Sequence, residues 1–244
     1  MSKTAQKWNE KAQNYNRYDP DPDRFEAKVI QKIEELGVIF EESSLLDVGA
    51  GTGVYTLRLA QKAKNVIAMD FSGEMLSVLA QDAQDLGIKN ILTSTHSWQD
   101  FECTQSFDIA LSTMSPAIEN REDFIKFHKC ATTKIYLGWA GLRDSDVLNT
   151  LFEAHSANYT PPNGVKKLTH WLKDEKIDFA YEQFDELKIS QSTSKDAIKK
   201  YAWHLSIRGV TPDERIIEVC LQDFCKDGKV VEKTQNRMGL LIWN

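Results

Sequence analysis

From about residue 44 onward, the chain alternates short apolar runs with longer stretches that carry apolar side chains at helical spacing. The apolar runs predict β-strands, and the periodic stretches predict amphipathic helices. This alternation is typical of a parallel sheet with helices on both faces. The predicted strands are 44–48, 65–70, 90–96, 106–114 and 133–141, and the predicted helices between them are 54–64, 73–85 and 122–131.

The two ends of the chain follow other patterns. Trp8, Ala12 and Tyr15 recur at helical spacing and predict a short helix, and a second helix follows a turn with two prolines at 18–23. The last hundred residues are less regular and predict helices near 147–155, 165–175, 197–205 and 211–224, with strands near 179–190 and 237–244. We expect one domain over 1–244, made of an N-terminal helical cap at 1–42, a core at 43–140, and a second half at 141–244 with a helical insertion at about 191–232.

Composition narrows the class of protein. The 244 residues carry a net charge of −6, which disfavours nucleic acid as a partner because phosphate binding usually needs a basic face. No apolar run is long enough to span a membrane, and the polar N-terminus lacks the apolar stretch of a signal peptide, so we expect a cytoplasmic protein. The four cysteines form no CxxC pair, so we expect no metal site and no disulfide framework.

One stretch carries most of the chemistry: LLDVGAGTG, in which Gly49, Gly51 and Gly53 follow a predicted strand and precede a predicted helix. Glycines at such a turn let a ligand approach the backbone, and the helix that follows offers free N–H groups. The spacing is G-x-G-x-G rather than the dinucleotide pattern G-x-G-x-x-G, because Val54 takes the place of the last glycine. Asp47 ends the strand, and its carboxylate would repel a pyrophosphate but favour a ligand with an ammonium or sulfonium group.

A second acidic residue strengthens this interpretation. Asp70 closes the second predicted strand, where a carboxylate can accept hydrogen bonds from both hydroxyls of a ribose. The ordered combination of strand, Asp47, glycine turn, helix, strand and Asp70 is far more specific than a glycine motif alone. It indicates a cationic nucleoside ligand.

The segments LDVGAGTG and VIAMDFSGEML resemble class I S-adenosylmethionine-dependent methyltransferases over roughly residues 43–140. The N-terminal WNEKAQNYNRYD is similar to the lead-in of the small-molecule enzymes related to ubiquinone and menaquinone C-methylation. The resemblance implies a Rossmann-like, doubly wound α/β fold with a seven-stranded, mainly parallel sheet, an antiparallel last strand and helical lid elements. It also implies S-adenosyl-L-methionine as the cofactor and S-adenosyl-L-homocysteine as its product.

Carried onto this sequence, the resemblance places the glycines along the methionine part of the cofactor, Asp70 on the ribose and Met75 on the adenine. Ser97 stands where the family often has an acidic residue against the adenine amino group, so a backbone group and the Trp98 ring are the alternatives here. The resulting cofactor-binding candidates are Asp47, Gly49, Ala50, Gly51, Gly53, Asp70, Phe71, Met75, Ser97, Trp98, Ser112 and Met114.

The implied reaction is an in-line displacement at the methyl carbon, which needs alignment and exclusion of water more than a catalytic dyad. A base matters only when the acceptor must lose a proton, so the catalytic residues stay open, with His155, His204 and Tyr159 as candidates. We expect a small-molecule acceptor in a partly aromatic pocket. Its candidate residues are Tyr15, Tyr18, Ser115, Trp139, Tyr201 and Trp203.

Two other functions remain open. An RNA or protein methyltransferase would need an open basic face, and the segment 112–118 lacks the amide or acid, second proline and aromatic typical of enzymes that modify base amines. A non-catalytic module that only binds S-adenosylmethionine is the other alternative. The sequence also leaves open whether the protein is a monomer or a homodimer.

Overall fold

The computed structural model describes residues 3–104 and 106–244, and the chain divides into two compact units. Unit 1 contains the described residues up to Gly138 together with Gly164–Glu182 and Gly239–Asn244. Unit 2 contains Trp139–Asn163 and Gln183–Met238. The predicted second half, 141–244, therefore contributes to both units.

All seven main strands contribute to the sheet of unit 1, in the order β3-β2-β1-β4-β5-β8-β6. Strands β1 to β5 pair in parallel, and β8 is the antiparallel strand near the C-terminus. The predicted fold class is confirmed, with one addition: a short strand, β7, pairs with β8 in unit 2. The strands are β1 (Ser44–Val48), β2 (Asn65–Asp70), β3 (Ile91–Thr95), β4 (Phe107–Thr113), β5 (Ala131–Ser145), β6 (Ala180–Ser192), β7 (Cys225–Lys226) and β8 (Lys229–Trp243).

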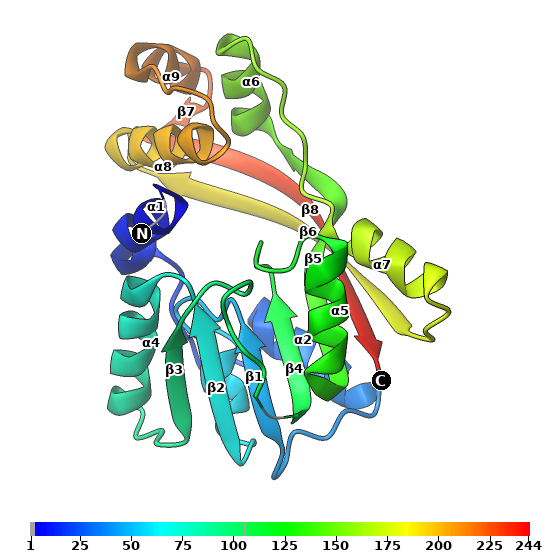
Figure 1. Cartoon of the computed structure of the whole chain (residues 1–244). Helices are drawn as coiled ribbons and strands as arrows, with labels where there is room; N and C mark the ends of the chain where they lie inside the picture. Colours follow the sequence, from blue (N-terminus) through cyan, green and yellow to red (C-terminus); the bar gives the residue numbers. More distant parts are fainter. Residues whose placement is uncertain (1–2, 105) are drawn as a thin grey trace. The chain divides into compact units, whose positions relative to one another are not determined.

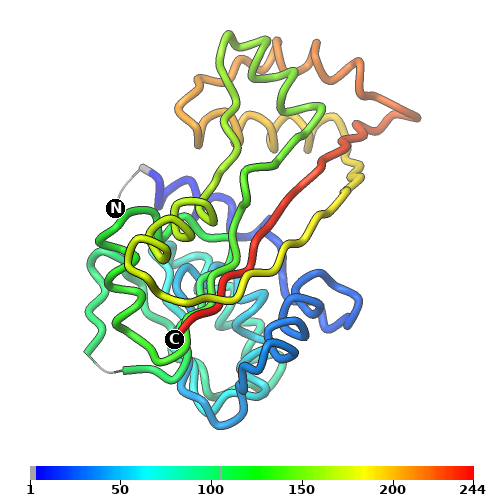
Figure 2. The backbone as a smooth tube through the Cα atoms, turned by 90° about the vertical axis from the view of Figure 1, so that its right-hand side faces the viewer, coloured from blue at the N-terminus to red at the C-terminus, as the bar shows by residue number. Residues whose placement is uncertain are grey.

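Helices cover both faces of this sheet, and Figures 1 and 2 show α2 and α5 on opposite sides of it. The central strands carry apolar residues on both faces, as expected for a sheet that is covered on both sides. The helices of unit 1 are α1 (Lys3–Lys11), the 3-10 helix η1 (Ala12–Asn14), α2 (Phe25–Glu35), α3 (Thr56–Leu59), α4 (Gly73–Asp85), α5 (Arg121–Lys129) and α7 (Gly164–Asp174).

Helix α3 is much shorter than the predicted helix 54–64. The side-chain amide of Asn90 donates hydrogen bonds to the carbonyl oxygens of Ala60 and Ala63, at 2.8 and 2.9 Å. These bonds satisfy carbonyl groups that would otherwise lack partners at the helix end, so the chain turns toward β2 here. The prediction missed this end because Asn90 is distant in sequence.

Unit 2 has a small core of its own. Helices α6 (Asp146–Ala154), α8 (Ser194–Ile207) and α9 (Glu214–Gln222) pack together through a cluster of buried side chains. Figure 2 shows these three helices grouped together. The largest members of the cluster are Leu148, Leu151, Phe152, Tyr201, Leu205, Ile217 and Leu221.

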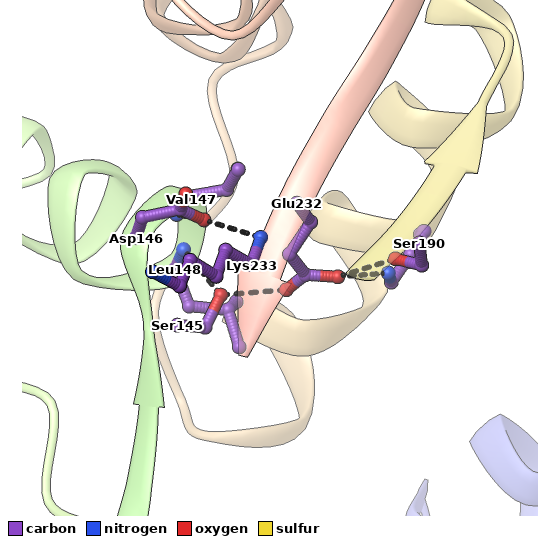
Figure 3. A network of polar contacts seen from close by, with 8 residues as sticks. Ser145, Asp146, Val147, Leu148, Ser190, Glu232 and Lys233 are labelled. Atoms are coloured by element: carbon purple, nitrogen blue, oxygen red, sulfur yellow. Dashed lines mark hydrogen bonds and ion pairs between the residues drawn. The ribbon is translucent and has the colours of Figure 1, made fainter. Parts of the chain in front are cut away.

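A buried carboxylate ties the elements of unit 2 together (Figure 3). Glu232 on β8 accepts hydrogen bonds from Ser145 Oγ at 2.6 Å and Ser190 Oγ at 3.2 Å. Its Oε2 also pairs with Lys200 Nζ at 2.5 Å. Burial alone would raise the pKa of Glu232, but the Lys200 charge and these hydrogen bonds outweigh it, and the pKa is lowered.

Replacing Glu232 with glutamine should lower the free energy of unfolding of unit 2 by about 2–4 kcal/mol, because Lys200 loses its anionic partner. A lowered pKa stabilises the fold above the ordinary carboxyl pKa of 4.5, and this contribution is lost as the pH falls through the folded value. Urea unfolding at neutral and acidic pH measures both effects. Glu218→Gln, at an exposed position on α9, is the matched control. Equal effects of the two variants would contradict the assignment.

Candidate active site

The glycine-rich turn after β1 places its three glycines in different surroundings. A Cβ on Gly49 would overlap the Ser115 hydroxyl, and a Cβ on Gly53 would lie 2.6 Å from Leu79 Cγ. Gly51 has a φ of +56°, and an added Cβ would meet no heavy atom within 4 Å. Gly49 and Gly53 are thus needed for close packing of the protein itself, and Gly51 is the glycine that faces open space.

Asp47, at the end of β1, is fully buried beside this turn. Its Oδ2 accepts a hydrogen bond from Thr56 Oγ1 at 2.6 Å, whereas Oδ1 has no hydrogen-bond partner among the described residues. Burial raises the pKa of Asp47 to about 7, with a further increase from the charge of Asp70 and a partial offset from Thr56. An unpaired, buried carboxylate oxygen is costly, so Oδ1 calls for a partner that the described residues do not supply.

Asp70, at the end of β2, orders the backbone around the turn. Its Oδ2 accepts a hydrogen bond from the Gly51 N–H at 2.9 Å, and its Oδ1 accepts one from the Ser72 N–H at 2.8 Å. Burial raises the pKa of Asp70, although the hydrogen bonds from Ser72, Gly51 and Phe71 partly oppose this. Since each carboxylate oxygen can accept a second hydrogen bond, Asp70 keeps acceptor capacity for a ligand.

The N-terminal segment lies against the glycine turn and the start of α4. Thr52 Oγ1 donates to the Asn16 carbonyl, and Ser72 Oγ donates to Asn9 Oδ1 at 2.6 Å. Arg17 pairs with Asp82 of α4. The segment therefore covers one side of the candidate site through polar contacts that sequence patterns do not reveal.

The two aromatic candidates of this segment have different surroundings. Tyr15 packs edge-on against Trp8, and both lie on the apolar cluster formed by Ala12, Met75 and Val78. The Tyr18 hydroxyl accepts a hydrogen bond from Gln61 at 3.0 Å. Tyr15 thus belongs to the apolar contact between the N-terminal segment and α4.

Two residues predicted to contact the adenine lie in the protein core. Met75 is 2% exposed. Trp98 is 1% exposed, with Phe101 stacked on its ring at 6.1 Å and Lys126 Nζ 4.5 Å from its ring centroid. The Ser97 hydroxyl donates to Asp100 Oδ2 at 2.6 Å. These side chains are committed to internal contacts, so the structure does not present the Trp98 ring to a ligand.

Residues at the end of β4 and just after it support the turn from the other side. Ser112 is fully buried, and its hydroxyl donates to the Val48 carbonyl at 3.0 Å, which ties the ends of β4 and β1 together. Met114 has a φ of +50°, and its N–H donates to the Leu137 carbonyl at 2.7 Å. Ser115 lies against Gly49. Of these candidates, Met114 and Ser115 are the partly exposed ones.

The catalytic candidate His155 lies in unit 2 and uses both ring nitrogens for backbone contacts. Nδ1 lies 2.7 Å from the Leu151 carbonyl and must therefore donate, while Nε2 lies 3.1 Å from the Asp213 N–H and must accept. This pattern requires a neutral imidazole with its proton on Nδ1. The geometry assigns His155 to holding the start of α9 and leaves it no free nitrogen for base catalysis.

The other unit 2 candidates are mostly enclosed by neighbouring side chains. Tyr201 is 1% exposed, and burial is the main cause of its raised pKa. The rings of Trp203 and His204 lie 5.1 Å apart. A guanidinium covers the ring of Trp139 and another covers that of Tyr159. Tyr201 is therefore a core residue of unit 2.

Sequence reasoning missed Thr56, which holds one oxygen of Asp47, and Asn16, which meets the glycine turn. Thr56 lies three residues after Gly53, in the helix that follows the glycine turn, so its position could have indicated a contact with Asp47. Within residues 3–104 and 106–244, no group of three or more His, Cys, Asp or Glu side chains is placed to hold a metal ion. No helix in the same ranges has the length and apolar character to span a membrane.

Residues 45–132 match a family described as "Methyltransferase domain". An uncharacterized protein of Haemophilus influenzae is 28% identical over 134 residues, which cover 49% of this chain and 50% of the relative. The chain thus matches only about half the length of this curated relative.

Solved structures share the fold at low sequence identity. The YcgJ protein of Bacillus subtilis has a TM-score of 0.58 and 15% identity, covering 88% of this chain and 97% of that one. Coclaurine N-methyltransferase bound to N-methylheliamine and S-adenosylhomocysteine has a TM-score of 0.53 and 13% identity. The match covers 94% of this chain and 76% of that one.

Proposed function

We propose that the chain transfers a methyl group to a small-molecule acceptor. The premise is that residues 45–132 form a methyltransferase domain of the class I, S-adenosylmethionine-dependent family. The observation that carries the proposal is the pair of buried carboxylates, Asp47 and Asp70, at the ends of adjacent parallel strands beside the glycine turn. Ligands of open parallel sheets bind beyond the carboxyl ends of the strands.

The residues present fit the cofactor. The unpaired Oδ1 of Asp47 is an acceptor for the methionine ammonium group, and the open space at Gly51 leaves room for a ligand against the backbone. Asp70, already positioned by two backbone N–H groups, would accept from the ribose hydroxyls. Met75 and Trp98 are left out of this assignment because their side chains pack inside the core.

When bound, the cofactor supplies a methyl group attached to a sulfonium. Transfer of this methyl group is intrinsically favourable, because the charged sulfonium becomes a neutral thioether. The protein's task is then to align the acceptor and exclude water. The contacts of Asn16 with Thr52 and of Asn9 with Ser72 hold the N-terminal segment over the turn and so limit solvent access. Since His155 has no free ring nitrogen, we propose that it does not act as the base.

A small-molecule acceptor is supported by the net charge of −6, which opposes binding of a polyanion. Enclosure of the turn by the N-terminal segment also favours a small ligand over a macromolecule. Transfer of a labelled methyl group to a panel of small amines, phenols and carboxylates, with total RNA in parallel, tests this. Labelling of RNA alone would overturn the acceptor class.

Replacing Asp70 with alanine should weaken binding of S-adenosylhomocysteine by at least about tenfold, because a charged hydrogen-bond acceptor is lost. The loss should exceed that value if the Gly51 and Ser72 N–H groups also lose their order. Calorimetric titration measures the binding, and thermal unfolding checks that the variant is folded. Glu74→Ala, at an exposed site on α4, is the control. Unchanged binding by Asp70→Ala would contradict the proposed pose.

A further inference from the structure

Two arginines of unit 2 lie over aromatic rings near one loop. The Arg143 guanidinium carbon lies 5.0 Å from the centroid of Trp139, and both residues belong to β5. The Arg208 guanidinium carbon lies 4.7 Å from the centroid of Tyr159, and its Nη1 donates to the Thr160 carbonyl at 2.9 Å. A guanidinium that lies over a ring face keeps N–H groups at its edges that can donate to other partners.

The loop 156–163 brings these two pairs together. At its start, Tyr159 and Thr160 hold Arg208, which follows the last residue of α8. At its end, the side chain of Asn163 lies 3.2 Å from the position that a Cβ on Gly141 would take. Gly141 lies between Trp139 and Arg143 in β5, so the same loop contacts both halves of the cluster.

The positive charge of this cluster is not compensated. Neither Arg143 nor Arg208 forms an ion pair with a carboxylate in the part of the chain that the structure describes. Burial lowers the pKa of Arg208, and the nearby charge of Arg143 lowers it further, while Tyr159 opposes this. Two guanidinium groups that repel each other in a protein of net charge −6 are held there at a cost in stability.

The Tyr159 hydroxyl adds an independent observation. It is buried and has no hydrogen-bond partner among the described residues. Its ring contacts both Phe152 of the unit 2 core, with ring centroids 5.2 Å apart, and the Arg208 guanidinium. The unsatisfied Tyr159 hydroxyl and the two guanidinium groups without a carboxylate partner thus hold more donors than the protein supplies acceptors for.

We propose that Arg143, Arg208 and Tyr159 form a binding site for the anionic group of a small molecule, a carboxylate or a phosphate. An anion supplies the acceptor atoms that the cluster lacks and removes the repulsion between the guanidinium groups. Arginine offers paired N–H donors that match the oxygens of both groups. All three residues belong to unit 2, and anion binding there does not depend on methyl transfer.

These contacts with aromatic rings and the loop distinguish Arg143 and Arg208 from other basic residues. Arg121, for comparison, pairs with Glu175 and lies over no aromatic ring among the described residues. Arg121 therefore carries the same charge as Arg143 and Arg208 but does not lie over an aromatic ring in the described part of the chain. Arg121→Ala is the matched control for loss of one positive charge.

The test is binding of inorganic phosphate and of succinate to the full chain, measured by calorimetry and by the rise in unfolding temperature. We expect Arg143→Ala and Arg208→Ala each to weaken binding by about tenfold or more, with Arg121→Ala unchanged. Tyr159→Phe should weaken it less. Preference for phosphate over succinate, or the reverse, identifies which anionic group the site prefers.

Two results would overturn the proposal. One is binding that Arg121→Ala reduces as much as the cluster variants do, which would show a general effect of charge. The other is the absence of binding by a folded native chain to both probes. Arg143→Lys and Arg208→Lys guard against misfolding, because they keep the charge and the long side chain while losing paired donors. Failure here would leave S-adenosylhomocysteine binding unaffected, so the two proposals are tested separately.

Discussion

Replacing Gly51 with alanine is expected to weaken binding of S-adenosylhomocysteine by about a hundredfold, with only a small loss of stability. The added methyl group meets no heavy atom of the protein within 4 Å, so the fold has room for it. The same space is where the proposed ligand would approach the backbone. The positive φ of +56° costs an alanine about 1 kcal/mol, which is the expected loss in the free energy of unfolding.

Gly37→Ala is a closely matched control. Gly37 has a φ of +91° and no heavy atom within 4 Å of an added Cβ, but it follows α2 and is remote from the turn in sequence. Both variants should lose similar stability in urea unfolding, and only Gly51→Ala should lose binding in calorimetry. Equal, near-native affinities for the two variants would show that the space at Gly51 is not part of the cofactor site.

Replacing Asp47 with asparagine is expected to stabilise the ligand-free protein at alkaline pH by on the order of 4 kcal/mol. The pKa of Asp47 is raised from 3.8 to about 7, so the folded state binds this proton more tightly than the unfolded state. Stability contributed by the neutral carboxyl is therefore lost as the pH rises from about 4 to about 7, at about 1.4 kcal/mol per pH unit. Asparagine carries no charge to bury and should flatten this dependence.

The same substitution should have the opposite effect on ligand binding. If the Asp47 carboxylate takes the ammonium group, affinity for S-adenosylhomocysteine rises as the pH approaches and passes about 7. Asp47→Asn should bind weakly and without that rise. Calorimetric titration and urea unfolding over a pH series measure both quantities. Thr56→Val, which removes the one hydrogen bond to Oδ2, should raise the pKa further and shift the rise in affinity to higher pH.

The parts of this molecule that could be predicted are those encoded by nearby residues. The alternation of strand and helix patterns predicts the sheet, and the resemblance of LDVGAGTG predicts the cofactor, and both are confirmed. The positions of Asp47 and Asp70 follow from the same logic, because a residue at the end of a parallel strand lies at the ligand-binding edge.

The remaining features depend on contacts between distant parts of the chain. Met75 and Trp98 are apolar residues at suitable positions, and nothing in the local sequence separates a ligand contact from a core contact with Ala12 or Phe127. His155 illustrates the same difficulty, since its partner Asp213 is 58 residues away. The end of α3 depends on hydrogen bonds from the distant residue Asn90, and the cover over the glycine turn depends on the distant residue Asn16.

The placement of β8 within the sheet has a consequence for synthesis on the ribosome. Its buried residues Leu240, Leu241 and Trp243 belong to unit 1, and the strand lies between β5 and β6 in the sheet order. While the nascent chain still lacks residues 239–243, β5 and β6 have no strand between them. The edge of β5 is then open to pairing with other chains. Vectorial translation therefore leaves the sheet of unit 1 incomplete until β8 has emerged from the ribosome.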